Sequence, residues 1–169
     1  MSITKHLQSY VERGEVSTEL EKSLDNPKER HALYKLVVNQ PARPYRQLLL
    51  RLLDKEIAFR MALWNGAAEG DENSWEGIRH CAYLLSRCGE PEDAKAIWKA
   101  QYLNQDVGEI EVGNFVGAGA SETLAFLAKS NDEVSQEISE FIRSSLSQPN
   151  ASDWLASWKI ERYESLTNT

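Results

Sequence analysis

Three histidines are the side chains best suited to proton transfer near neutral pH: His6, His31 and His80. His80 falls beside the apolar face of a predicted helix, which favours a packing or surface role over a catalytic one. No G-x-S-x-G nucleophile motif is present. Residues 117–122 (GAGASE) lack the third glycine of a dinucleotide fingerprint and the lysine of a P-loop. We therefore expect a protein that is not an enzyme and needs no cofactor.

The two cysteines, Cys81 and Cys88, lie seven positions apart in one predicted helix. Their Cα atoms would be about 10 Å apart, which is too far for a disulfide. Zinc sites usually combine close cysteine pairs into four ligands, a pattern that this spacing lacks. We predict two buried core thiols and no metal site.

The charge of the chain is distributed unevenly. The net charge is −7, yet residues 1–60 carry 11 basic and 8 acidic side chains, whereas residues 61–169 carry 8 basic and 18 acidic ones. Binding to nucleic acid or an anionic membrane depends on clustered Lys and Arg, so neither is expected. An acidic surface favours a basic partner, although acids that only maintain solubility explain the same balance.

Two stretches of the acidic part contain no Lys or Arg at all, 61–78 and 100–128. If the fold brings them to one end, their carboxylates form a negative surface beside two aromatic side chains of the kind that protein interfaces favour. Glu109 and Glu111 offer paired carboxylates for acid–base chemistry, but such acids in a loop are usually solvated. The predicted partner-binding residues are Asp71, Glu72, Trp75, Tyr102, Asp106, Glu109 and Glu111.

The elements that must position these residues are helices. Apolar residues recur at three- and four-residue steps almost from end to end, and Gly14, Pro27, Gly66, Gly89 and Pro149 interrupt the pattern. Residues 75–102 predict two helices joined by a Cys-Gly-Glu-Pro turn, with the proportions of a tetratricopeptide or HEAT-like hairpin. Residues 104–119 fit either a short β-hairpin or an irregular loop.

The sequence thus predicts an all-α fold of packed antiparallel helical hairpins. At 169 residues we expect one domain, with charge-balanced helices over 1–65 and acidic helical hairpins over 71–169. No apolar run approaches the roughly 18–20 residues that span a bilayer, and the N-terminus lacks the apolar region of a secretory signal. We therefore expect a cytoplasmic protein.

One long stretch resembles a known class of proteins. It comprises WEGIRHCAYLLSRCGEPEDAKAIWKA at 75–100, Gln105-Asp106 and VGAGASETL at 116–124. These residues resemble small helical bacterial immunity proteins of polymorphic toxin systems, including contact-dependent growth inhibition. The resemblance covers about residues 71–128 and implies a cytoplasmic protein that binds and blocks one cognate toxin domain. It implies no catalytic residue.

Three functional hypotheses follow. In the first, an immunity protein covers the basic active site of a toxin, for example a nuclease, with its acidic surface. In the second, a helical-repeat adaptor binds peptides from several partners in a groove. In the third, a small hydrolase uses His80 or His31 with a loop carboxylate.

Overall fold

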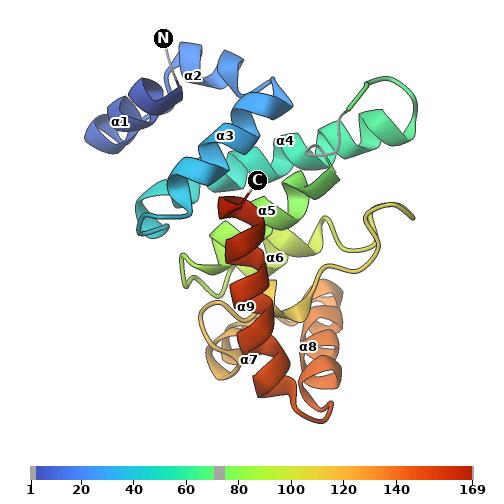
Figure 1. Cartoon of the computed structure of the whole chain (residues 1–169). Helices are drawn as coiled ribbons and strands as arrows, with labels where there is room; N and C mark the ends of the chain where they lie inside the picture. The colour runs from blue at the N-terminus through green and yellow to red at the C-terminus, as the bar shows by residue number, and fades with distance from the viewer. Residues whose placement is uncertain (1–2, 71–74, 169) are drawn as a thin grey trace.

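The computed structural model describes residues 3–70 and 75–168, and the described part of the chain is helical and contains no strand. The all-α prediction is confirmed. The first four helices are α1 (Ile3–Arg13), α2 (Thr18–Ser23), α3 (Pro27–Val37) and α4 (Arg46–Trp64). A single 3-10 turn, η1 (Arg43–Tyr45), leads into α4, and Figure 1 shows α1, α2 and α3 above and beside it.

Five further helices complete the described chain. They are α5 (Gly77–Ser86), α6 (Asp93–Trp98), α7 (Ala120–Lys129), α8 (Glu133–Leu146) and α9 (Ala151–Thr167), with a further 3-10 turn, η3 (Val112–Asn114), before α7. In Figure 1, α7 and α8 lie at the bottom of the molecule, and α9 runs back from them towards α3. The C-terminal end of α9 thus lies near the middle of the molecule beside α5, whereas the chain begins at the top of this view.

Local sequence explains most of these boundaries. Ser17, Asn26 and Asp132 each accept a backbone N–H of the following helix with their side chains, and Pro27 occupies the first turn of α3. Gly14 ends α1 with φ of 72°, a left-handed conformation that costs other residues free energy.

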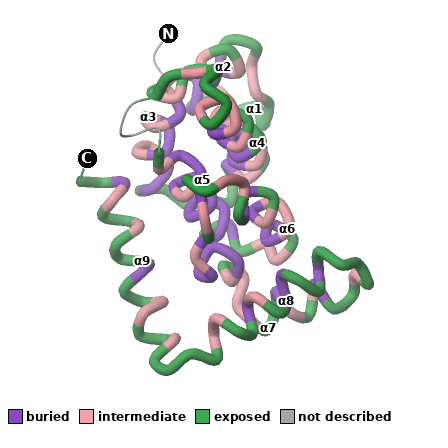
Figure 2. The backbone as a smooth tube through the Cα atoms, turned by 90° about the vertical axis from the view of Figure 1, so that its right-hand side faces the viewer, coloured by how far each residue is buried: buried purple, intermediate pink, exposed green. Residues whose placement is uncertain are grey.

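The core is built around α4 and α5, which pack on each other, while α3 and α6 cover α5 from other directions. Figure 2 shows the buried residues concentrated in this central region, and α9 mostly exposed. In α9 only Trp158 and Leu166 are buried. Cys81 and Cys88 are free thiols buried in this core, as predicted. Burial raises the pKa of the Cys88 thiol to about 12.

A charged network lies inside the core as well. The guanidinium of Arg30 donates to the Glu56 carboxylate at 2.8 and 3.3 Å, and the Tyr34 hydroxyl donates to the same carboxylate at 2.9 Å. Arg30 also donates to the carbonyl of Leu24, which ties α2, α3 and α4 together. A Cβ at Gly77 would lie 2.4 Å from a Glu56 oxygen, so α5 can approach α4 this closely only through glycine.

The segment between α6 and α7 is an irregular loop, which is one of the two alternatives that the sequence left open. Residues 106–116 form turns and η3 instead of a β-hairpin. Val107, Ile110, Val112 and Phe115, whose alternation resembled a strand, are all buried. Among the described residues, none of the helices combines the length and the apolar content needed to cross a membrane.

Candidate partner-binding site

The end of α4 and the loop after α6 meet at one corner of the molecule. Asn104 of the loop approaches the sulfur of Met61 at 4.0 Å, and Arg79 of α5 donates to the carbonyl of Val107 at 2.8 Å. Figure 1 shows the end of α4 and this loop projecting to the same side. Within the described residues, the fold therefore brings the two base-free stretches together.

The loop itself is held by its own hydrogen bonds. The Asn104 side chain accepts from the backbone of Asp106 and Val107, a short polar turn typical of asparagine. The Gln101 side chain accepts from the backbone of Ile110, and the backbone N–H of Tyr102 donates to the carbonyl of Gly108. Tyr102 has a φ of 54°, a left-handed conformation that strains a residue other than glycine.

Three aromatic side chains are exposed at this corner. Trp64 is 47% exposed, Trp75 is 45% exposed and Tyr102 is 60% exposed. Trp75 lies under the guanidinium of Arg60, 4.1 Å from its ring centre. Trp64 follows Arg60 by four positions on α4, so it lies one turn further along the same helix face.

Two of the predicted acids, Asp106 and Glu109, are exposed beside these rings. Glu109 accepts a hydrogen bond from the Tyr102 hydroxyl at 2.7 Å, and this bond raises the pKa of Tyr102. Trp64, Trp75, Tyr102, Asp106 and Glu109 together are called the aromatic–acidic corner below. Asp71 and Glu72 lie outside the described residues.

Glu111 is placed differently from the other predicted acids. Its carboxylate pairs with Arg162 of α9 and lies 3.7 Å from the Arg79 side chain, and it is also within reach of the Asn114 amide. Arg162 pairs on its other side with Glu76 at 2.9 Å. The Glu111 carboxylate thus helps to attach α9 and is paired within the protein, whereas its predicted role in partner binding stays a prediction.

Sequence reasoning missed the arginines of this region. Arg60, Arg79 and Arg162 come from outside the base-free loop and place positive charge behind it. Arg60 is only 2% exposed, and its Nε and Nη1 atoms have no hydrogen-bond partner in the described part. Burial lowers the pKa of Arg60, while Asp106 opposes this shift. Only Arg60 could have been found from the sequence, because it precedes Trp64 by four positions and therefore shares a face of the same helix.

The histidine that a hydrolase would need is inside the protein. His80 is 2% exposed and lies 5.6 Å from His31 between ring centres, and its Nε2 contacts the Ser165 hydroxyl at 3.1 Å. Burial, with His31, Arg162 and Lys35 nearby, lowers the pKa of His80 to about 4. His80 lines none of the described cavities. The described residues contain no group of three or more metal-ligating side chains.

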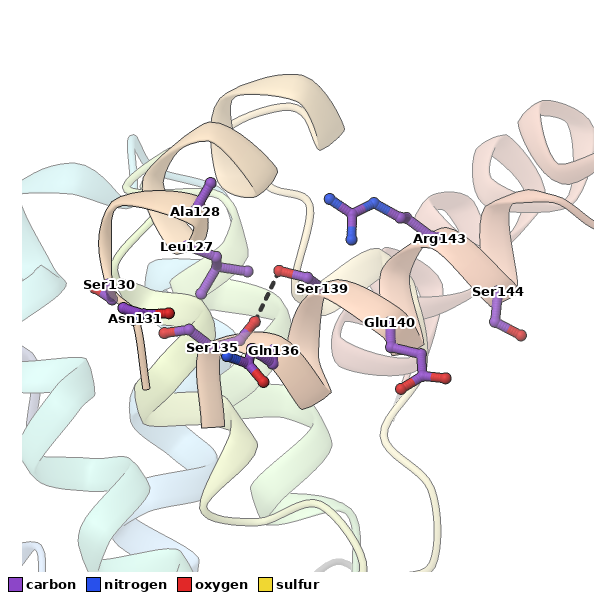
Figure 3. A pocket seen from close by; sticks show the side chains of 10 residues that line it. All are labelled: Leu127, Ala128, Ser130, Asn131, Ser135, Gln136, Ser139, Glu140, Arg143 and Ser144. Atoms are coloured by element: carbon purple, nitrogen blue, oxygen red, sulfur yellow. Dashed lines mark hydrogen bonds between the residues drawn. The ribbon is translucent and has the colours of Figure 1, made fainter. Parts of the chain in front are cut away.

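The largest described cavity lies elsewhere, between the end of α7 and α8 (Figure 3). It has a volume of about 520 Å³ and an open, serine-rich wall that includes Ser135, Ser139 and Ser144. The Ser139 hydroxyl donates its hydrogen to the backbone carbonyl of Ser135, so this hydrogen is not available to a ligand. None of the predicted partner-binding residues lines this cavity.

The comparisons with known proteins add no relative. No protein-family model matches the chain, and neither a curated protein nor a solved structure shows significant similarity to it.

Proposed function

We propose that this chain is an immunity protein that binds a cognate bacterial toxin domain through the aromatic–acidic corner. The observation that supports the proposal is the exposure of three large aromatic side chains beside two exposed carboxylates on an internally hydrogen-bonded loop. Aromatic anchors within a polar rim are typical of the residues that dominate protein–protein binding. A loop that is ordered before binding loses less conformational entropy in the complex.

The charges at the corner favour a basic partner. Asp106, Glu109 and the exposed Glu69 leave this end acidic at its outer edge, whereas Arg60 and Arg79 lie behind the loop. Carboxylates can occupy the positions of substrate phosphates opposite Lys and Arg, which fits a nuclease toxin domain. We place Asp106 and Glu109 against that cleft and Trp75 and Tyr102 at its wall.

The first experiment identifies the toxin. Affinity capture from the source bacterium with mass spectrometry should yield one dominant basic protein, expected to be the C-terminal part of a large secreted protein. That domain, expressed alone, should arrest bacterial growth, and co-expression of this chain should restore it. Growth arrest that co-expression leaves unchanged would contradict the proposal.

Variants then locate the binding surface. Trp75→Ala combined with Tyr102→Ala should weaken toxin binding by about 100-fold or more, because interface aromatic residues often contribute 2 kcal/mol or more each. Asp106→Asn with Glu109→Gln should weaken binding by about 2–5 kcal/mol, mainly through faster dissociation, because cationic groups of the cleft are left without their partners. Glu133→Gln with Glu161→Gln, on α8 and α9, is the matched control that should bind like the unmodified chain.

The adaptor hypothesis makes a different prediction in the same assay. An adaptor should capture several proteins weakly, and short peptides from them should compete for one groove. A single tight complex that is lost with the corner variants and kept with the control pair distinguishes the immunity function from that alternative.

A further inference from the structure

A second site with the opposite charge lies at the C-terminal end of α5. A cavity of about 230 Å³ opens where the end of α5 meets α9 and the segment before α7. It is lined by Tyr83, Ser86, Arg87, Gly117, Trp158 and Lys159. Two of the six lining residues are cationic and none is acidic, in a chain whose net charge is −7.

The cations at this cavity are not neutralised. No ion pair involving Arg87 or Lys159 is found within the described residues. The Arg87 guanidinium donates to the carbonyls of Val38 and Gln40 at the end of α3, which fixes its position and leaves its remaining N–H groups for other acceptors. A cavity lined by two cationic residues and no acidic one favours an anionic ligand.

A buried donor at the same cavity also lacks a partner. Trp158 is 6% exposed, and its indole Nε1 has no hydrogen-bond partner in the described part of the protein. The six-membered ring of Trp158 packs against Gly113, so the edge that carries Nε1 faces away from Gly113. The Nε1 atom has almost no accessible surface, so the Trp158 ring forms a wall of the cavity and its N–H does not face the opening.

The walls of the cavity are set by close packing. A Cβ at Gly117 would lie 1.9 Å from the Ser86 carbonyl oxygen, so the chain passes α5 there only as glycine. The Tyr83 ring meets the Trp158 ring edge-on at 5.8 Å between centres. The Tyr83 hydroxyl donates to the Lys159 carbonyl at 3.4 Å, which connects α5 to α9 beside the cavity.

We propose that this cavity is a binding site for a phosphate group, either inorganic phosphate or a small phosphate monoester, held by Arg87 and Lys159 beside the Trp158 ring. A phosphate dianion matches two positive charges, whereas a carboxylate balances only one of them. The neighbouring N-terminus of α7 is not the anion site, because the Glu122 carboxylate lies directly beside Gly119 there. The proposal does not depend on the immunity function.

The test follows the Trp158 indole proton by NMR. The chain has five tryptophans, and the Trp158→Phe variant identifies the Trp158 signal by its loss while keeping a ring against Gly113. Titration with inorganic phosphate at pH 7.5 and constant ionic strength should shift this signal saturably in the unmodified chain. Phenyl phosphate should compete for the same site, and acetate should bind at least tenfold more weakly.

Lys159→Gln should weaken phosphate binding by about tenfold, the loss expected for one charge-assisted hydrogen bond. Lys129→Gln, an exposed lysine on α7, is the matched control and should bind like the unmodified chain. No saturable shift, an equal response to acetate, or unchanged binding in Lys159→Gln would each overturn the proposal.

Discussion

The most constrained residues of the protein are buried polar ones. Glu56 accepts from Arg30 and Tyr34 in the core, and Gly77 leaves room for its carboxylate. Burial raises the pKa of Tyr34 well above its usual value. Such a network stabilises the fold only while all its members are present, because each charge left alone in the interior keeps its desolvation cost.

Removal of one member of this buried network should therefore strongly lower the stability of the fold. Glu56→Met should lower the free energy of unfolding by about 3–5 kcal/mol, because it leaves the Arg30 guanidinium buried without its ion pair. Urea unfolding followed by circular dichroism measures this change. The double variant Arg30→Met with Glu56→Met should lose less than Glu56→Met alone. A double variant that is less stable than the single one would contradict this account.

The His80 side chain should make stability depend on pH. Its pKa is about 4 in the folded protein, below the usual value of 6.5, so between these values the unfolded chain binds more protons. Stability should therefore be fully present above pH 6.5 and fall by up to about 3 kcal/mol as the pH drops to 4. His80→Gln should show a smaller loss over this range in urea unfolding, and an unchanged slope would contradict the assignment.

At the scale of elements, short signals predicted most helices. Gly14, Pro27 and Asp132 act within one turn of the chain, so their positions alone fix where α1 ends and where α3 and α8 begin. The strand-like alternation of residues 106–116 was misleading because its apolar side chains are buried by neighbouring helices without any strand pairing. Burial of alternate residues does not require a β-sheet.

The candidate site was less predictable than the helices, because it depends on contacts between residues that are far apart in the chain. Tyr102, Asp106 and Glu109 were found from local composition, and the structure exposes all three. Glu111 pairs with Arg162, which is 51 positions away, and no spacing rule connects the two. No spacing rule connects Arg79 of α5 with the loop residue Val107 to which it donates either.

These long-range pairs help to hold α9 against the rest of the protein. Arg162→Met removes contacts to Glu76 and Glu111 and should increase amide hydrogen exchange throughout α9 while α4 remains protected. Glu161→Gln, its exposed neighbour, should leave exchange unchanged. Equal protection of α9 in both variants would show that its other contacts, among them Trp158, Leu166 and the Ser165–His80 hydrogen bond, hold this helix without Arg162.

At the scale of the molecule, one buried apolar cluster extends from Leu7 in α1 to Leu166 in α9. Continuous burial of this kind favours cooperative unfolding. The chain should therefore unfold in one transition, with the same midpoint for backbone circular dichroism and for tryptophan fluorescence. Tryptophans occur only from residue 64 onward, so fluorescence reports α4 and later elements. Two separate midpoints would contradict the prediction of a single domain.

The burial of both cysteines has a practical consequence for labelling. Cys81 and Cys88 lie inside the core, and burial raises the pKa of both thiols, so little thiolate is available to react in the folded state. A cysteine introduced at an exposed position such as Ser157 can then carry a fluorophore while the native thiols stay unmodified. Distances from α9 to a bound toxin or ligand thereby become measurable by energy transfer in the otherwise unaltered chain.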